Sequence, residues 1–149
     1  MSLEKKIAED LKAAMKAKDK NALRGIRAVK AAILLAKTDG SGAELNEEAE
    51  IKLLQKLIKQ RKDSVEIYQK QNRSELAQTE FEEIAIIEKY LPAQLGEAEL
   101  EEILSKIIAE TGASSMKDMG KVMGLAAKQL AGQADGKTIS SVVKRLLNS

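Results

Sequence analysis

The sequence predicts an all-helical protein, and three observations support this fold class. Hydrophobic residues make up 44% of the 149 residues but aromatic residues only 2%, so any core must be built from aliphatic side chains. The chain is rich in Ala, Leu, Ile, Lys and Glu, which favour helices, and it contains a single Pro. Runs of β-branched residues that would favour strands are few. The length suits one ordinary domain or two small ones.

Two helices are expected first. Ser2 can cap one of them, and Asp19 or Asn21 can cap the next, which runs through Lys37, because short polar side chains accept hydrogen bonds from the first N–H groups of a helix. Apolar residues recur at helical spacing in both. These residues are Ile7, Leu11 and Met15 in the first helix and Ile26, Val29, Ile33 and Ala36 in the second.

A loop rich in Gly and Ser, residues 38–45, separates these helices from a long third helix. That helix is expected to begin at Asn46 and to reach about Asn72, with glutamates in its first turn that suit the positive end of a helix. Its apolar residues follow a three-four spacing, with Arg61 in the one skipped position. Arg61 therefore either extends its charge to solvent or interrupts the packing seam.

A fourth helix is expected to follow residues 71–74 and to end at Leu91. Proline disfavours the helical conformation of the residue before it, and Pro92 follows Leu91. The apolar face predicted for this helix consists of Phe81, Ile84, Ile87 and Leu91.

Three further helices are expected between Gly96 and the end of the chain. One stops at residues 111–112, the next begins at Ser115 with a pairing to Asp118 that resembles a capping box, and Gly132 ends it. The last begins at residues 135–136. Apolar residues at helical spacing are Leu100, Ile103, Leu104, Ile107 and Ile108 in the first of these and Ile139, Val142, Val143, Leu146 and Leu147 in the last.

The sequence thus predicts an N-terminal four-helix domain, residues 1–92, and a small three-helix domain, residues 96–149. The break in helical periodicity at Pro92 and Gly96 marks the hinge between them. The second domain is close to the lower size limit for independent folding.

The missing residue types exclude more chemistry than the present ones suggest. The chain has no His, no Cys and no Trp. It therefore lacks an imidazole base, a thiolate nucleophile and the usual ligands of zinc, which removes most hydrolase and transferase mechanisms. No catalytic residue, cofactor or metal is assigned from the sequence.

The start of the chain is charged and is not followed by the apolar stretch of an export signal. The longest apolar run, residues 31–36, is far shorter than a membrane span. On these grounds we expect a cytoplasmic location and no membrane partner.

Residues 118–124, DMGKVMG, place Gly120 and Gly124 on one helix face, although each glycine costs a helix about 1 kcal/mol relative to alanine. Two interpretations fit: tight packing against another helix, or a smooth surface that the backbone of a phosphate polymer can approach. Met119 and Met123 are interpreted as core filler, with a groove for a partner as the alternative.

Charge is distributed unevenly along the C-terminal part. Residues 96–112 have a net charge of −4 and residues 113–149 a net charge of +4. The basic residues of the latter segment either line a surface for a nucleic-acid backbone or form an ordinary solvated face. They are Lys117, Lys121, Lys128, Lys137, Lys144 and Arg145.

A second basic concentration, residues 5–30, has a net charge of +6. Because aromatic residues are so scarce, recognition of single strands by base stacking is not expected. Structured RNA, recognised by its shape and phosphates, is the better candidate.

Three segments closely resemble the GatB/YqeY family, and in particular its stand-alone YqeY-like members. They are EKYLPAQL (residues 88–95), DMGKVMG (118–124) and GQADGKTISSVVKRLL (132–147). Family members of this type have an N-terminal helical domain and a small three-helix domain. The small domain also forms the tail of the B subunit of the tRNA-dependent amidotransferase, where it engages tRNA.

The resemblance implies roles for individual residues. Lys121 and Lys137 become candidate RNA contacts, whereas Lys117, Lys128, Lys144 and Arg145 are added on charge alone. The positions implied to shape the backbone are Gly120, Gly124, Gly132 and Gly136.

Three functions remain as hypotheses. The preferred one is a non-catalytic tRNA-binding protein, or an accessory to a tRNA enzyme, in a bacterial cytoplasm; its partners would be tRNA and a protein of aminoacyl-tRNA synthesis or amidation. The second is a part in glutamine-dependent amidation, a carbon–nitrogen ligase reaction, with the missing subunits supplied by other chains. The third is a helical adaptor that binds proteins. No Gly-rich phosphate loop or cluster of metal-binding carboxylates is evident, so we do not expect the chain to be an enzyme on its own.

Overall fold

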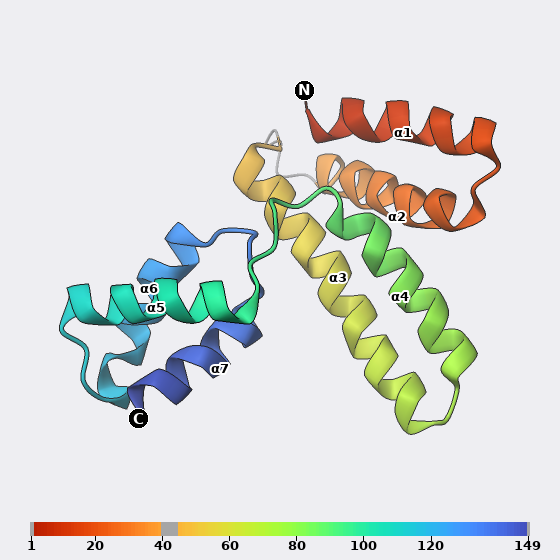
Figure 1. The fold of residues 1–149 in the computed structure, drawn as a ribbon. Coiled ribbons are helices and arrows are strands. Elements are labelled where there is room, and N and C mark those ends of the chain that lie inside the picture. The colour runs from red at the N-terminus through yellow and green to blue at the C-terminus, as the bar shows by residue number, and fades with distance from the viewer. Residues whose placement is uncertain (1, 40–44, 149) are drawn as a thin grey trace. The chain divides into compact units, whose positions relative to one another are not determined.

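The computed structural model describes residues 2–39 and 45–148, and every regular element within them is helical (Figure 1). The elements are α1 (Leu3–Ala17), α2 (Lys20–Lys37), α3 (Glu47–Lys70), α4 (Ser74–Glu88), α5 (Glu97–Thr111), the 3₁₀ turn η1 (Met116–Asp118), α6 (Met119–Gln129) and α7 (Gly136–Leu147). The predicted all-helical class is confirmed. Most of the predicted loop at residues 38–45, namely residues 40–44, lies outside the described residues.

Helix starts follow the predicted capping residues. Ser2, Asp19 and Asn46 each accept a hydrogen bond from a backbone N–H in the first turn of α1, α2 and α3. Asp19, not Asn21, caps α2. Capping is local chemistry, and this is why the sequence located these starts well.

The end of α4 was predicted three residues too late. The helix stops at Glu88, and the N–H groups of residues 89–91 donate instead to the carbonyls three residues earlier. The chain therefore tightens into a turn before Pro92 rather than continuing as an α-helix up to it.

No described helix is both long enough and apolar enough to cross a membrane. The backbone contacts divide the chain into two compact units, Met1–Leu91 and Pro92–Ser149. Each unit has its own cluster of buried aliphatic side chains. The assignment of domains to residues 1–92 and 96–149 stays a prediction.

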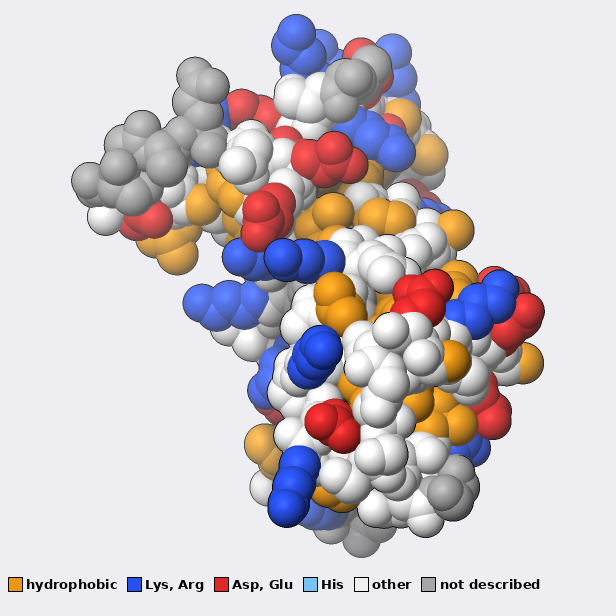
Figure 2. Space-filling view, turned by 90° about the vertical axis from the view of Figure 1, so that its left-hand side faces the viewer, with side chains coloured by type: hydrophobic (Ala, Val, Ile, Leu, Met, Phe, Trp, Pro, Cys, Tyr) orange, Lys and Arg blue, Asp and Glu red, His pale blue; other side chains and the backbone are white. Residues whose placement is uncertain are grey.

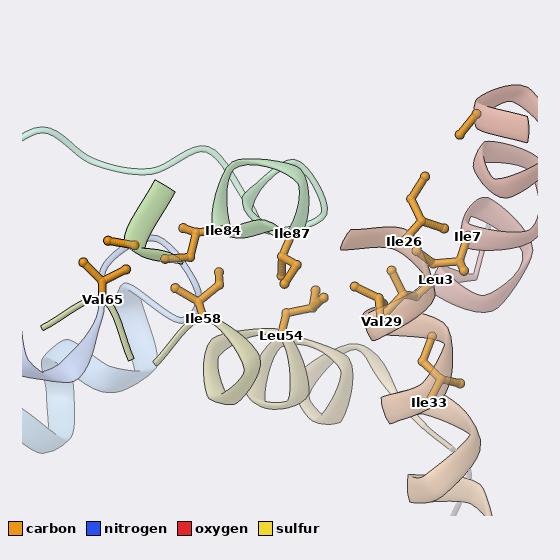
Figure 3. Close-up of a cluster of buried hydrophobic side chains, with 12 residues drawn as sticks. Leu3, Ile7, Ile26, Val29, Ile33, Leu54, Ile58, Val65, Ile84 and Ile87 are labelled. Carbon is orange, nitrogen blue, oxygen red and sulfur yellow. The ribbon is translucent and has the colours of Figure 1, made fainter. Parts of the chain in front are cut away.

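In the first unit, two antiparallel helix pairs, α1 with α2 and α3 with α4, pack through α2 and α4 (Figure 1). Figure 3 shows Ile87 of α4 pointing toward Leu54 of α3, with Val29 of α2 on the side facing them. Leu3 and Ile7 of α1 lie close to Ile26 of α2 in the same view. The core is aliphatic throughout, as the composition requires.

Gly25 allows a close approach between two helices. It is buried in the middle of α2, where a Cβ would lie 2.6 Å from both Cβ and Cγ2 of Ile86 on α4. Ile86 Cβ is attached directly to its backbone and cannot swing aside. Beside this contact, Arg24 of α2 forms a 2.7 Å ion pair with Glu82 of α4. From the sequence, a close approach was one of two interpretations of Gly120 and Gly124, and Gly25 was not singled out.

Tyr90 joins the beginning of the unit to its end. Its hydroxyl donates a 2.6 Å hydrogen bond to Oδ2 of Asp10 on α1, and Nζ of Lys6 lies 5.4 Å from its ring centroid. Burial, followed by the hydrogen bond to the Asp10 carboxylate, raises the pKa of Tyr90. The phenol therefore stays a donor at neutral pH and holds α1 against the turn that follows α4.

Arg61 interrupts the seam between α3 and α4, the second of the two alternatives. Its side chain is only 16% exposed, its Nη1 donates to the Leu57 carbonyl at 3.0 Å, and its Nε lies 3.9 Å from Oε2 of Glu83. Burial, and then the neighbouring Glu83, raises the pKa of Glu80, while Arg61 opposes this shift. A compact charged cluster of Arg61, Glu80 and Glu83 thus replaces apolar packing here.

Phe81 was predicted on the apolar face of α4, but it is exposed. The buried face of α4 is carried by Ala77, Ile84 and Ile87, and Phe81 lies at the edge of this face, where it stays 45% exposed. The prediction used the helical spacing of large apolar residues alone, and this spacing does not show how far each side chain is covered by its neighbours.

Gly25→Ala should lower the free energy of unfolding by about 1 to 3 kcal/mol, because the added methyl group overpacks against Ile86 and outweighs the higher helix propensity of alanine. Gly124→Ala is the matched control, since a Cβ there would meet nothing within 4 Å. That variant should gain up to about 1 kcal/mol. Urea unfolding followed by circular dichroism measures both. A gain in both variants would show that α2 and α4 do not approach closely at Gly25.

Glu80→Gln should stabilise the protein at neutral pH by several tenths of a kcal/mol, because it removes a charge that burial and Glu83 disfavour. A raised carboxyl pKa penalises the folded state above that pKa, and the penalty disappears as the pH falls. The difference from the parent protein should therefore shrink as the pH falls through the raised pKa of Glu80, and it should vanish once the pH is below the ordinary pKa of a glutamate. Glu9→Gln, an exposed change on α1, serves as control. A Glu80→Gln difference that grows on acidification would contradict this account.

Candidate nucleic-acid interface

The second unit is a bundle in which α5, α6 and α7 all contact one another. Its core contains Leu100, Leu104, Ile107, Val122, Ala126, Leu130, Ile139, Val142, Val143 and Leu147. Met119 and Met123 are partly buried against it, which confirms their interpretation as core filler. These contacts decide which side of each helix faces solvent.

The beginning of α6 is fixed by a capping box. Ser115 Oγ accepts from the N–H of Lys117, and Oδ2 of Asp118 accepts from the N–H groups of Ser114 and Ser115. The predicted Ser115–Asp118 pairing is therefore present. It closes the 3₁₀ turn η1, from which α6 continues directly.

One face of η1 and α6 carries lysines and glycines together. Val122, Ala126 and Leu130 mark the buried side of the helix. The opposite side consists of Lys117, Gly120, Lys121, Gly124 and Lys128, all exposed, and the helical period places them in one stripe. We call these five residues the α6 face.

The two glycines of the α6 face pack against nothing in the described part of the chain. A Cβ added at Gly120 or at Gly124 would have no neighbour within 4 Å. The interpretation of tight helix packing is therefore wrong for this unit. A ligand can reach the backbone of α6 between the lysines without meeting a side chain.

A second basic stripe lies on α7. Asp135 caps this helix by accepting a 2.6 Å hydrogen bond from the N–H of Thr138, and Gly136 is its exposed first residue. Lys137 and Lys144 lie seven residues apart on the exposed side of α7. Neither lysine, nor any of the three on the α6 face, forms an ion pair with another described residue.

Arg145 differs from the other five basic candidates. Its guanidinium lies 3.3 Å from Oε2 of Glu101 and 3.6 Å from Oε1 of Glu97, both on α5. The net negative charge of residues 96–112 thus meets part of the positive charge of residues 113–149 inside the unit. Arg145 holds α7 against α5, and it is the least available of the six for an external phosphate.

Gly132 shapes the backbone in a way that only the structure shows. It is buried, with a φ of 77°, and its carbonyl accepts a 2.6 Å hydrogen bond from Nε2 of Gln94. The next carbonyl, of Gln133, accepts from the N–H of Leu95 at 3.0 Å. The predicted hinge is therefore tied to residues 132–133. In the sequence, the polar Gln94 within the EKYLPAQL segment was the feature that could have suggested this contact.

On the face drawn in Figure 2, Lys and Arg side chains are dispersed among uncharged and acidic ones. No single continuous basic area covers this view. On this face, positive charge is carried by separate side chains. Such spacing suits contacts to individual phosphates rather than a deep basic cleft.

The fold and this surface define a small helical protein with a basic, glycine-containing helix face. The chain belongs to the YqeY-like family: a model described as "Yqey-like protein" matches residues 4–147. This confirms the resemblance found in the three sequence segments.

Curated relatives share the name "Altered inheritance of mitochondria protein 41, mitochondrial". The protein of Lachancea thermotolerans is 42% identical over 107 residues, covering 70% of this chain and 57% of its own length. The protein of Kluyveromyces lactis is 33% identical over 138 residues, covering 93% of this chain and 72% of its own. That of Pyrenophora tritici-repentis is 28% identical over 148 residues, covering 97% and 80%. The chain thus spans little more than half the length of the first of these relatives.

The relatives contradict two expectations, a bacterial source and a cytoplasmic location. They are fungal proteins named as mitochondrial, and they point to a mitochondrial location instead. The expectation of a cytoplasmic location rested on the lack of an export signal and of an apolar run long enough to span a membrane. Neither feature distinguishes the cytoplasm from the interior of an organelle, which is why the prediction was wrong.

Gln94→Ala should increase proteolytic cleavage between residues 92 and 96, because the side chain that ties this segment to the Gly132 carbonyl is lost. The stability of the whole protein should fall by about 1 kcal/mol. Gln129→Ala, an exposed change at the end of α6, is the control. Limited proteolysis with mass identification of the fragments measures the cleavage site. Equal cleavage of both variants in this segment would mean that the Gln94 contact does not restrain it.

Proposed function

We propose that this protein is a non-catalytic module that binds structured RNA, with tRNA as the first candidate, or that accompanies a tRNA enzyme. The observation that carries the proposal is the α6 face, where three exposed lysines without an ion pair to described residues flank two bare glycines. A purely solvated helix face gains nothing from glycines, because alanine would make the helix more stable.

The chemistry of the α6 face suits a phosphate backbone. Lysine ammonium groups act as point charges that neutralise phosphates, and binding is then driven by the release of counterions. The glycines let a sugar–phosphate chain lie closer to the helix than side chains would permit. Without aromatic platforms on this face, recognition depends on the shape of the RNA rather than on stacked bases.

The lysines of α7 extend the proposed surface. Lys137 lies two residues after the Asp135 cap, and Lys144 lies two turns further along the same exposed side. The family resemblance supports Lys121 on α6 and Lys137 on α7 as contacts. We assign Arg145 a supporting role, because its ion pairs to Glu97 and Glu101 hold α7 in place.

We also propose that residues 1–92 and 96–149 are two domains of four and three helices. Two separate aliphatic clusters support this division. In this proposal the small domain contacts RNA, and the first domain holds the partner protein, which belongs to aminoacyl-tRNA synthesis or amidation. Ammonia release from glutamine by the purified protein would favour the catalytic alternative. Protein capture that survives ribonuclease would favour the adaptor.

The paired variant Lys121→Gln with Lys128→Gln should weaken binding to folded tRNA and reduce the slope of log affinity against log salt by about 2, since each lost phosphate contact contributes roughly 0.9. The names of the relatives make a mitochondrial tRNA the first RNA to test. Lys137→Gln with Lys144→Gln tests α7 in the same way. Fluorescence anisotropy over a series of salt concentrations gives both affinity and slope.

Lys18→Gln with Lys20→Gln is the charge-matched control, because both lysines are exposed and lie outside the proposed surface. Circular dichroism should show an unchanged fold in all three variants, since exposed lysine changes usually alter stability by less than about 0.5 kcal/mol. If all three variants lose affinity equally, the attraction is diffuse and the α6 face is not the site. If the parent protein binds tRNA no better than a random duplex of equal length, the tRNA function itself is refuted.

A further inference from the structure

The outer face of α2 exposes its apolar side chains to an unusual degree. Ile26, Val29 and Ile33 face the core, so the opposite side of the helix faces solvent. On that side Leu34 is 62% exposed and Leu35 is 71% exposed, and Ala31 beside them is also exposed. Side chains this exposed protrude from the surface instead of lining a groove.

Cations accompany these leucines. Arg27 and Lys30 are exposed on the same face; Arg27 lies two turns before Leu34 and Lys30 lies one turn before it. The whole of α2, from Lys20 to Lys37, contains no acidic residue. An ion pair between Lys37 and Glu4 places the start of α1 beside the end of α2, which brings the exposed Lys5 to the same end of the helix pair.

We propose that this α2 face, made of Arg27, Lys30, Ala31, Leu34 and Leu35, binds the surface of an anionic lipid bilayer. Leu34 and Leu35 enter the boundary between head groups and acyl chains, and Arg27 and Lys30 contact lipid phosphates. The two signals together, apolar insertion and positive charge, give reversible attachment where either alone would be marginal. The expectation of no membrane partner considered only segments long enough to span a bilayer.

The combination of features favours lipid over the other anionic partners. A nucleic acid would use the cations but offers nothing for two protruding leucines. A stable protein interface needs about 1,000 Å² or more of complementary surface, whereas this apolar area is two adjacent side chains at a helix end. A bilayer needs no shape complementarity, so a small convex apolar point surrounded by positive charge is sufficient.

Co-sedimentation of the full chain with vesicles tests the proposal. Vesicles of phosphatidylcholine mixed with phosphatidylglycerol should bind the protein, and vesicles of phosphatidylcholine alone should bind it much more weakly. Leu34→Ser with Leu35→Ser should weaken the partition coefficient at least roughly tenfold, from lost apolar burial. Arg27→Gln with Lys30→Gln should weaken it roughly 25-fold, about fivefold per charge, and flatten its salt dependence.

Matched controls come from the same unit. Ile67→Ser with Phe81→Ser removes two exposed apolar side chains from α3 and α4, and Lys56→Gln with Lys89→Gln removes two exposed charges. Both should leave vesicle binding within about twofold of the parent protein, since surface changes away from the contact act weakly. Because Arg27 and Lys30 are exposed, their variant stays informative even if the leucine variant unfolds.

Several results would overturn the proposal. The first is that the parent protein shows no preference for anionic vesicles. The second is that the control variants lose as much vesicle binding as the test variants. The third is that the melting temperature of the leucine variant falls sharply while the arginine–lysine variant still binds vesicles like the parent protein. Self-association that the leucine variant abolishes would assign the α2 face to a second copy of the chain. If the Arg27 and Lys30 variant loses tRNA binding while its vesicle binding is unchanged, the α2 face would be assigned to nucleic acid.

Discussion

The close approach of α2 to α4 at Gly25 is the constraint on which the first unit depends. With no side chain at Gly25, Ile86 packs directly on the α2 backbone, and the Arg24–Glu82 ion pair lies beside this contact. α1 packs mainly on α2, so this contact, together with the hydrogen bond from Tyr90 to Asp10, positions both helices against the α3–α4 pair. It also determines which side of α2 faces solvent. Leu34 and Leu35 lie on that side and are therefore exposed.

The EKYLPAQL segment serves the two units separately. Tyr90 completes the first unit by donating to Asp10, and Gln94 and Leu95 begin the second by donating to the carbonyls of Gly132 and Gln133. Buried or bent backbone needs such partners, because an unpaired polar group removed from water costs free energy. This segment, one of the three that resemble the family, thus has a structural reason for its polar residues on both sides of Pro92.

Glycines occur in this protein for opposite physical reasons. Gly25 and Gly132 have structural reasons, a close approach in one case and a left-handed, buried backbone in the other. Gly120 and Gly124 satisfy no packing requirement in the described residues and lower the helix propensity of α6. Exposed residues that lower the stability of a protein, with no packing contact that offsets the loss, are typical of contact surfaces. This contrast links the α6 face to binding more strongly than its charge does.

The sequence by itself determined the helical class, the starts of the first and third helices after Ser2 and Asn46, the Ser115–Asp118 pairing and the family, because composition, capping and motifs are local properties. It also supplied all six basic candidates, since charge is read directly from residue type. It could not decide that Asp19 rather than Asn21 caps α2, that Gly25 rather than Gly124 meets another helix, that Phe81 stays exposed, or that Arg145 is engaged by Glu97 and Glu101. Each of these depends on which helices lie side by side. That arrangement is decided only when distant segments pack, so only the tertiary structure separates a buried face from an available one.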